Sequence, residues 1–343
     1  MRRENNVTHN GNGVLDGSSH LLEMEEVQRY FSSKQITRHG IDRTTVRAVD
    51  GVSLGIDPGE TLGIVGESGC GKSTLGRMAL GLLRPTSGRV LFRGSDINAL
   101  RRQQLRSFRP KVQAIFQDPY GSLDPRMKIG EAISELVARQ HSDLSRSQVR
   151  ERTLDLISMV GLDVAKADAY PRELSGGQRQ RIGAAKAFAT DPELIVADEP
   201  VSALDVSIQA QIVNLLVELR ERSGVGYLLI AHGLAMVKHV SDRIGVLYLG
   251  KLVEIGPSDA VLSTPFHHYT AALMAAAPEA GAVAQTRRTL TVLQGEPASP
   301  RHVPSGCRFR TRCVAATEHC STEEPLLQEI SAGHSVACYF PRS

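Results

Sequence analysis

The sequence lacks the features that would place the chain inside a membrane or send it out of the cell. None of its apolar runs approaches the roughly 18–20 residues that a membrane-spanning helix needs. The first 20 residues are rich in Asn, Gly and Ser and contain no apolar core of a secretory signal. We expect residues 1–20 to be disordered and the chain to stay in the cytoplasm. Any role at a membrane would then need partner chains.

The sequence also lacks a strong excess of either charge. Its 40 Lys and Arg residues face 37 Asp and Glu residues, a formal net charge of +3, which is too small to indicate nucleic-acid binding. We interpret the basic stretch 101–111 as a solvated face or an anchor for acidic groups of a membrane partner, and we predict no nucleic-acid partner. With 343 residues, 41% of them hydrophobic, the chain is long enough for two domains or one domain with appendages.

Cysteine is scarce until the C-terminal end. One of the five cysteines, Cys70, lies in a glycine-rich loop, and the others follow the spacing C-x5-C-x6-C-x17-C: Cys307, Cys313, Cys320 and Cys338. In a cytosolic chain such a group indicates metal binding more than disulfides. Four thiolates suit a 4Fe-4S cluster or tetrahedral zinc, although the C-x2-C pairs of zinc ribbons are absent. Free thiols are the third alternative.

Apolar runs alternate with helical periods over residues 46–256, which is typical of α/β layers. The patterns predict strands at 60–66, 89–93, 193–198 and 227–231, helices at 72–83 and 206–221, and a hairpin at 244–255 around Gly250. Residues 128–165 have helical periods with little strand pattern, and we interpret them as an inserted helical subdomain. After Pro257 the composition shifts, and a loop-rich stretch, 278–306, leads to the cysteine-containing tail.

A glycine-rich loop carries the strongest functional pattern. Residues 66–73 match G-x-x-x-x-G-K-[ST] between a predicted strand and a predicted helix. Glycines let the backbone N–H groups face phosphates, and the helix N-terminus adds its positive dipole. Lys72 should reach the β and γ phosphates of ATP, and the Ser73 hydroxyl should bind Mg²⁺. The alternative is a turn that merely joins strand to helix. The nucleotide-binding residues predicted here are Gly66, Glu67, Ser68, Gly69, Cys70, Gly71, Lys72, Ser73 and Thr74.

Two acids follow the apolar run 194–197. Asp198 and Glu199 would lie at the carboxyl end of a strand, where open α/β sheets bind ligands. We predict that Asp198 holds Mg²⁺ through water and that Glu199 is the general base for the attacking water. The alternative is that the acids only begin a turn, since Pro200 follows.

A second anion site precedes the helical run 179–189. It consists of a Ser, two glycines and a Gln: Ser175, Gly176, Gly177 and Gln178. A helix N-terminus with such residues binds anions, but one nucleotide needs only one phosphate loop. The second site should therefore serve a nucleotide held by another copy. A simple helix N-cap is the alternative.

With Leu174, this segment resembles the signature motif of ABC transporter ATPases, and further motifs follow in that family's order. Gln117 is similar to the Q-loop glutamine, which touches Mg²⁺. Asp205, in residues 202–205, is similar to the D-loop residue at the dimer interface. His232 is similar to the switch histidine at the γ-phosphate.

The resemblance covers about residues 45–256 and implies an α/β P-loop NTPase fold. It implies an ABC cassette over residues 21–256, with an antiparallel β region and a helical subdomain at about 118–180. It also implies a head-to-tail dimer in which each ATP lies between one subunit's phosphate loop and the other subunit's signature motif.

Residues 117–126, 201–207 and 267–273 resemble the dipeptide and oligopeptide importer branch. This implies ATP-driven import of peptides, or of a small solute such as nickel, with two membrane permeases, an extracytoplasmic solute-binding protein and a sister ATPase in a heterodimer. The chain would lie peripherally on the cytoplasmic face of the inner membrane. Residues 257–343 would form the branch's C-terminal extension, where some members carry a 4Fe-4S cluster. A soluble ABC ATPase without a transport role is the alternative.

The sequence departs from the family pattern at three positions: Gly233 stands where Asp is usual, Lys186 where Arg is usual, and His268 where Pro is usual. The family's adenine-stacking aromatic would be Tyr30 or Phe31. An apparent insertion, residues 32–44, separates these two from the core, and core packing explains either residue equally well.

Overall fold

The computed structural model describes residues 20–37, 40–118, 121, 123–202, 204–231, 234–276 and 298–342. The disorder predicted for residues 1–20 falls outside this part of the chain except at His20, as does most of the loop-rich stretch. In the described part, no helix combines the length and the apolar character needed to cross a membrane.

The central sheet has eight strands in the order β11-β12-β10-β9-β3-β8-β7-β6. Five neighbouring strands are parallel: β6 (Val112–Ile115), β7 (Leu194–Asp198), β8 (Gly226–Ile230), β3 (Thr61–Val65) and β9 (Arg243–Tyr248). Three more continue it antiparallel: β10 (Lys251–Pro257), β12 (His334–Val336) and β11 (Gln328–Ser331). Every residue of β3 and β8 is buried, as expected for parallel strands covered on both faces.

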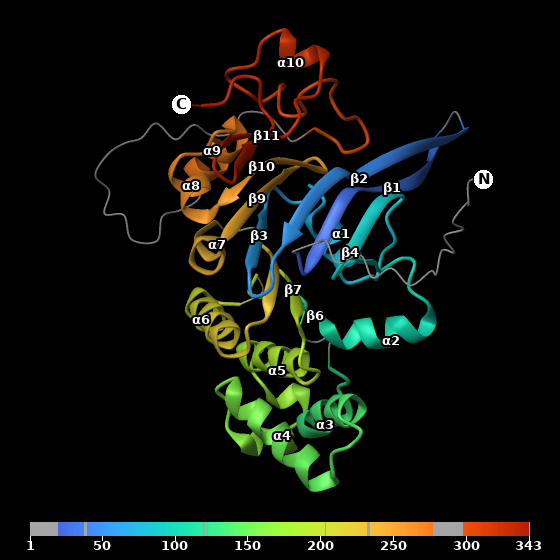
Figure 1. Ribbon diagram of the computed structural model, residues 1–343, viewed down its shortest axis with the longest axis vertical. Helices are drawn as coiled ribbons and strands as arrows, with labels where there is room; N and C mark the ends of the chain where they lie inside the picture. The colour runs from blue at the N-terminus through green and yellow to red at the C-terminus, as the bar shows by residue number, and fades with distance from the viewer. Residues whose placement is uncertain are drawn as a thin grey trace, which may run out of the picture.

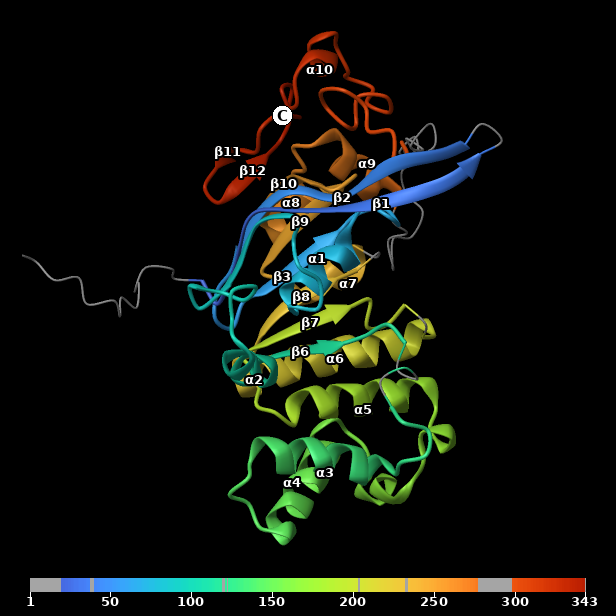
Figure 2. The same cartoon turned by 90° about the vertical axis from the view of Figure 1, so that its right-hand side faces the viewer.

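A second, antiparallel sheet covers one side of the molecule, as the resemblance implied. Its order is β2-β1-β4-β5, with β1 (Leu22–Thr37), β2 (Gly40–Ile56), β4 (Ser87–Phe92) and β5 (Ser95–Asp96). The β1–β2 hairpin is long and projects from the body of the molecule (Figure 2). The apparent insertion is therefore the outer part of this hairpin.

One group of helices lies together at one end of the molecule (Figure 1). That end contains α3 (Ile129–Gln140), α4 (Arg146–Met159), the 3-10 turns η1 (Val164–Asp168) and η2 (Pro171–Glu173), and α5 (Gly176–Phe188). The others are α1 (Lys72–Ala79), α2 (Arg102–Lys111), α6 (Val206–Ser223), α7 (Leu234–Val240), α8 (Ser258–Ser263), α9 (His268–Ala276) and α10 (His319–Thr322). The helix predicted at 72–83 ends earlier, at Ala79, because Gly81 has φ +64°.

Two apolar cores lie on opposite faces of the central sheet. One joins α1 to the antiparallel sheet through residues such as Leu75, Met78 and Leu22. The other joins the sheet to α5 and α6 through residues such as Ile182 and Leu216. Burying an apolar side chain of this size stabilises a fold by about 1.5–3 kcal/mol. These two cores fix α1 and α5 to different sides of the sheet.

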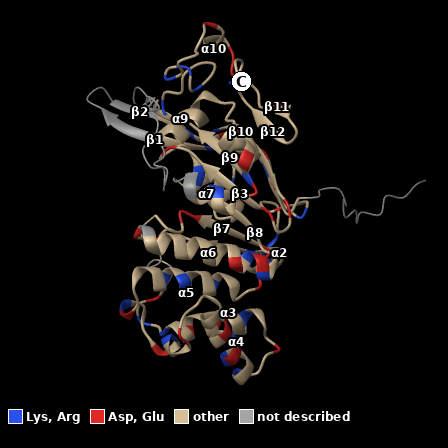
Figure 3. Cartoon of the chain, turned by 90° about the vertical axis from the view of Figure 1, so that its left-hand side faces the viewer, with Lys and Arg blue, Asp and Glu red and all other residues tan. Residues whose placement is uncertain are grey.

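The C-terminal tail, residues 298–342, lies at the end of the molecule opposite the helical end (Figure 1). It is joined to the central sheet where β12 pairs with β10. The fully buried Glu254 carboxylate accepts hydrogen bonds from the backbone N–H groups of Phe266 and His267, and it lies 2.8 Å from Nε2 of His334. On the face shown in Figure 3, basic and acidic residues are interspersed, in keeping with the small net charge.

Candidate functional site

The phosphate loop connects β3 to α1, as the sequence predicts. Gly66 has φ +153° and Gly71 has φ +113°. A Cβ added to Gly66 would lie 2.1 Å from the carbonyl oxygen of Leu247, and one added to Gly71 would lie 2.0 Å from the carbonyl oxygen of Ala48. Only glycine fits both the conformation and the space. These two positions explain why the loop curls tightly before the helix begins.

Lys72 is turned back onto the loop. Its Nζ donates hydrogen bonds to the carbonyl oxygens of Gly66, at 2.8 Å, and Glu67, at 3.1 Å, and the residue is only 4% exposed. A buried ammonium held by neutral carbonyls favours an anionic partner, because a full negative charge compensates it better than two dipoles. The position of Lys72 therefore suits it to bind a phosphate group.

Two of the three residues predicted at Mg²⁺ meet across the sheet edge. Ser73, at the start of α1, donates its hydroxyl to Oδ1 of Asp198, at the end of β7, over 3.0 Å. Burial raises the pKa of Asp198 above its usual range. A hydroxyl and a carboxylate at this distance are hard oxygen ligands of the kind that Mg²⁺ prefers.

The ends of neighbouring parallel strands bring further predicted residues to the same edge. Ile115 of β6 pairs with Ala197 of β7, so Gln117 and Glu199 follow adjacent strand ends. Glu199 has φ +50°, and its N–H donates to the carbonyl of Ile230 over 2.9 Å. A non-glycine residue in this conformation is strained. Such strain is common at functional sites.

Gln117 is exposed, and the loop that carries it is tied to α5 because Gln180 donates its side-chain amide to the carbonyl of Phe116 over 3.2 Å. His232 lies outside the described residues, as does Gly233. The described strand β8 ends at Ile230, beside β7.

The second predicted anion site lies at the N-terminus of α5. The Ser175 hydroxyl accepts from the Gln178 N–H, and the Gln178 side chain accepts from the Ser175 N–H, at 3.3 and 3.0 Å. These two hydrogen bonds form a reciprocal helix N-cap, and Ser175 is exposed. Gly177 is buried where a Cβ would lie 2.6 Å from Cγ2 of Ile208, so α5 and α6 approach closely. Asp205 is the exposed N-cap residue of α6.

The two predicted phosphate-binding segments are not brought together within one chain. The helices that follow them, α1 and α5, pack in different cores on opposite faces of the central sheet (Figure 2). A nucleotide on the phosphate loop would therefore leave Ser175 free for another molecule.

Sequence reasoning missed two residues that contact the phosphate loop. The phenol oxygen of Tyr269, on α9, accepts from the Glu67 N–H over 2.8 Å. The Arg312 guanidinium, in the tail, binds the Glu67 carboxylate through both nitrogens at 2.8 and 3.0 Å. Tyr269 belongs to a motif that indicated only the peptide-importer branch, and nothing in the sequence around Arg312 indicated a role at the nucleotide.

The candidate adenine residues lie at the hairpin. The Tyr30 hydroxyl donates to Asp50, and burial together with this carboxylate raises the pKa of Tyr30 to about 12. The Arg47 guanidinium lies 5.8 Å from the centre of the Tyr30 ring. Phe31 is 37% exposed, so core packing was the wrong interpretation for that residue. The stacking role itself stays a prediction.

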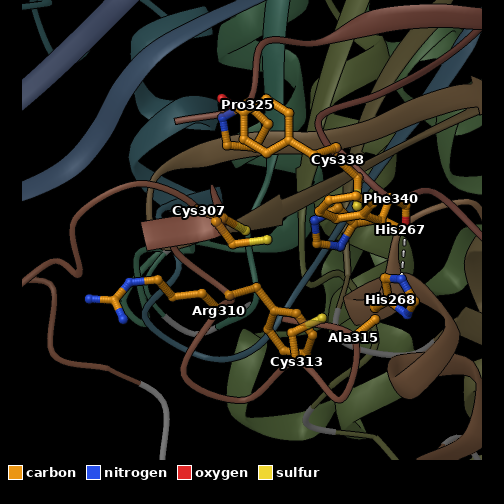
Figure 4. Close-up of a pocket in the computed structure, with 12 residues that line it drawn as sticks. His267, His268, Cys307, Arg310, Cys313, Ala315, Pro325, Cys338 and Phe340 are labelled. Atoms are coloured by element: carbon orange, nitrogen blue, oxygen red, sulfur yellow. Dashed lines mark hydrogen bonds between the residues drawn. The ribbon is translucent and has the colours of Figure 1, made fainter. Parts of the chain in front are cut away.

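The four tail cysteines line a single pocket (Figure 4), together with residues that include His267, His268 and Phe309. None of the four forms a disulfide bond. Burial raises the pKa of Cys307 and Cys313, and it raises that of Cys338 to about 11. Among the described residues, no three His, Cys, Asp or Glu side chains are arranged to hold a metal ion. The described residues therefore do not confirm the metal-binding role expected of these cysteines.

Comparison with known proteins gives two family matches. Residues 49–202 match the model described as "ABC transporter", and residues 253–320 match that described as "Oligopeptide/dipeptide transporter, C-terminal region". The oligopeptide transport ATP-binding protein OppF of Escherichia coli is 47% identical over 95% of this chain and 98% of that protein. The putative oligopeptide transport ATP-binding protein YkfD of Bacillus subtilis is 48% identical over 94% and 96%.

Solved structures agree in fold. The dimeric ATP-binding cassette MJ0796, in a post-hydrolysis state with ADP and Pi, is 28% identical and matches with a TM-score of 0.60, covering 69% of this chain and 98% of that chain. The protein cbiO1 of Clostridium perfringens, part of an ABC transporter complex, is 26% identical with a TM-score of 0.60, covering 71% and 91%.

Proposed function

The chain belongs to the ATP-binding subunits of ABC transporters, and on that premise we propose that it hydrolyses ATP to drive the import of di- or oligopeptides, or of a small solute such as nickel. The observation that carries the proposal is the convergence of Lys72, Ser73 and Asp198 at one sheet edge. The matching C-terminal region and the peptide-transport relatives support the solute class. The alternative of a soluble ABC ATPase without a transport role is not favoured.

In this mechanism the phosphate loop binds the β and γ phosphates through its backbone N–H groups. Lys72 exchanges the carbonyls of Gly66 and Glu67 for phosphate oxygens. Ser73, and Asp198 through water, would hold Mg²⁺, which would neutralise charge on the phosphates. Glu199 accepts a proton from the attacking water as general base. Gln117 and His232 keep their predicted roles beside Mg²⁺ and the γ-phosphate.

The second half of each ATP site comes from another subunit. The exposed N-terminus of α5, with Ser175, Gly176, Gly177 and Gln178, binds the γ-phosphate of the partner's nucleotide, and Asp205 lies at the dimer interface. We propose a sister ATPase as that partner, two membrane permeases and a solute-binding protein as the rest of the transporter, and a peripheral position on the cytoplasmic face of the inner membrane. The cassette spans residues 21–256 with its helical subdomain at about 118–180, and residues 257–343 form the extension.

The test uses the full chain and follows ATP binding and hydrolysis. Lys72→Ala should abolish detectable ATP binding. Glu199→Gln should retain ATP binding but lower the hydrolysis rate by roughly 100-fold or more, the usual contribution of a general base. Arg150→Gln, an exposed change on α4, should behave as wild type. Normal hydrolysis by Glu199→Gln would contradict the proposed base.

The solute class is tested separately, with the partner subunits present in vesicles. Peptides added on the side of the solute-binding protein should raise the ATPase rate, whereas single amino acids should not. A chain that hydrolyses ATP at the same rate with and without its membrane partners and solute would favour the soluble alternative.

We further propose that the tail cysteines hold a 4Fe-4S cluster. Its support is that Cys307, Cys313, Cys320 and Cys338 line one pocket, since a cluster several ångströms across needs thiolates around it and not at one point. Protein purified without oxygen should contain about four iron and four sulfide per chain. Zinc in place of iron, or no metal, would contradict this proposal and leave the ATPase untouched.

A further inference from the structure

The C-terminal extension holds one residue of the phosphate loop at two points. The Glu67 N–H donates to the Tyr269 hydroxyl over 2.8 Å, and its carboxylate receives both terminal nitrogens of Arg312 at 2.8 and 3.0 Å. The Arg312 side chain is 4% exposed and that of Glu67 is 22% exposed. A bidentate pair this well shielded from water is strong and directional.

Arg312 lies beside a cluster of aromatic side chains. Its guanidinium lies 6.0 Å from the centre of the Phe309 ring, and Tyr269 packs against both Phe309 and Tyr248, with ring centres 5.4 and 4.5 Å apart. These aromatic side chains form a buried layer between the tail and the phosphate loop. The position of Glu67 therefore depends on the packing of the tail.

The same tail segment makes a second connection to the nucleotide side of the molecule. Arg308 donates to Oδ2 of Asp50 over 2.5 Å and to the carbonyl of Leu249 over 2.5 Å. Gly250, the residue after Leu249, donates its N–H to the carbonyl of Cys70 in the phosphate loop over 2.8 Å. Segment 307–313 thus contacts the loop directly through Arg312 and indirectly through Arg308.

The charge of Glu67 explains why such a connection matters. Its carboxylate lies in the loop that receives a polyphosphate, and its carbonyl oxygen accepts from Lys72 over 3.1 Å. Without a cation beside it, this carboxylate would repel the incoming phosphates and compete for Lys72. Arg312 is the cation that the structure supplies.

We propose that Arg312 is a positioning residue for ATP binding. It neutralises and orients Glu67, so the C-terminal extension sets the conformation and charge of the phosphate loop. This inference rests on the proposed ATPase function and adds to it a part of the chain that lies outside the cassette motifs.

The test measures the Kd of a fluorescent ATP analogue with Mg²⁺ on the full-length chain. Arg312→Gln should raise this Kd roughly tenfold, the effect of losing one charged hydrogen-bonded pair, and should raise KM for ATP more than it lowers kcat. Arg312→Lys keeps the charge without the bidentate geometry and should give a smaller increase. The matched control Arg342→Gln, at an exposed tail position, should leave Kd at the wild-type value.

The double variant Glu67→Gln/Arg312→Gln separates positioning from simple damage to the tail. With the carboxylate removed, loss of Arg312 should matter little, so the double variant should bind ATP more tightly than Arg312→Gln alone. An unchanged Kd in Arg312→Gln, or no recovery in the double variant, would overturn the inference. If the wild-type chain bound no ATP, the proposed function would fail first and this inference with it.

Discussion

At the residue scale, the hydrogen bonds of the buried polar groups behind the phosphate loop depend on the protonation state of one histidine. His267 is 1% exposed. Its ring nitrogen Nδ1 accepts a hydrogen bond from the backbone N–H of Tyr269 over 3.0 Å, and its backbone N–H donates to the carboxylate of Glu254 over 3.0 Å. Burial, together with the neighbouring His268, lowers the pKa of His267 to about 3. A proton on Nδ1 would remove the acceptor that orients Tyr269, whose hydroxyl contacts the phosphate loop.

We therefore predict that titration of His267 makes part of the free energy of unfolding depend on pH. An unfolded His has a pKa of about 6.5, so between that pH and about 3 the unfolded state binds the extra proton. The free energy of unfolding contributed by His267 is therefore complete above about pH 6.5 and decreases as the pH falls. Urea unfolding at pH 7, 6, 5 and 4 should show a shallower decline for His267→Asn, which keeps an acceptor but does not titrate. Parallel curves for the two proteins would contradict the prediction.

The phosphate loop shows the same dependence on single positions. Gly66 and Gly71 are fixed by backbone oxygens about 2 Å from any added Cβ, so their identity follows from geometry. Glu67 has no such backbone requirement. Its partners in the tail, Tyr269 and Arg312, give it a role that its neighbours in the sequence do not.

At the element scale, α5 and α6 carry the predicted contacts to a partner. Gly177 faces Ile208 at a distance that leaves no room for a Cβ, which would lie 2.6 Å from Cγ2. The close approach of the two helices keeps Ser175 and Asp205 at neighbouring helix N-termini. The relative position of the two motifs thus depends on one small residue.

We therefore predict that Gly177→Ala lowers the free energy of unfolding by about 1–2 kcal/mol, the typical result of overpacking. Ile208→Ala removes the clashing methyl groups, so the double variant should lose less stability than the sum of the two single variants. Chemical denaturation of the three variants measures this coupling. Strict additivity would show that α5 and α6 do not constrain each other at this point.

At the scale of the whole molecule, the proposed function assigns the phosphate loop and Ser175 to different nucleotides. The helices that follow them, α1 and α5, pack on opposite faces of the central sheet. The C-terminal tail, which contacts the phosphate loop, lies at the end of the molecule opposite the helical end (Figure 1). This arrangement is the one expected if the chain supplies one half of each of two ATP sites.

This predicts assembly that depends on ATP. The hydrolysis-deficient Glu199→Gln variant should form a dimer with ATP and Mg²⁺, either with itself or more strongly with a sister ATPase, as measured by light scattering after size exclusion. Adding Ser175→Arg places a bulky side chain at the exposed α5 N-terminus and should prevent the dimer, whereas Arg150→Gln should not. A dimer that persists with Ser175→Arg would mean that α5 does not meet the partner's nucleotide.

Much of this protein follows from the sequence alone. The fully buried strands β3 and β8, the turn at Gly250 and the phosphate loop are local patterns, because burial on both faces and positive φ angles restrict the residue types at each position. The acids Asp198 and Glu199 were placed by the same reasoning, since strand ends in a parallel sheet share one edge. The helix at α1 was overextended because an apolar pattern does not show that Gly81 ends it.

Only the tertiary structure decided which distant residues meet. Ser73 and Asp198 are 125 positions apart, and Glu67 and Arg312 are 245 apart. No local preference encodes such pairs, because they form only when sheet, helices and tail pack together. The same holds for the four tail cysteines: their spacing suggested a shared ligand, but only packing brought them to one pocket. Local chemistry determined the parts of the site, and long-range packing determined how they act on one another.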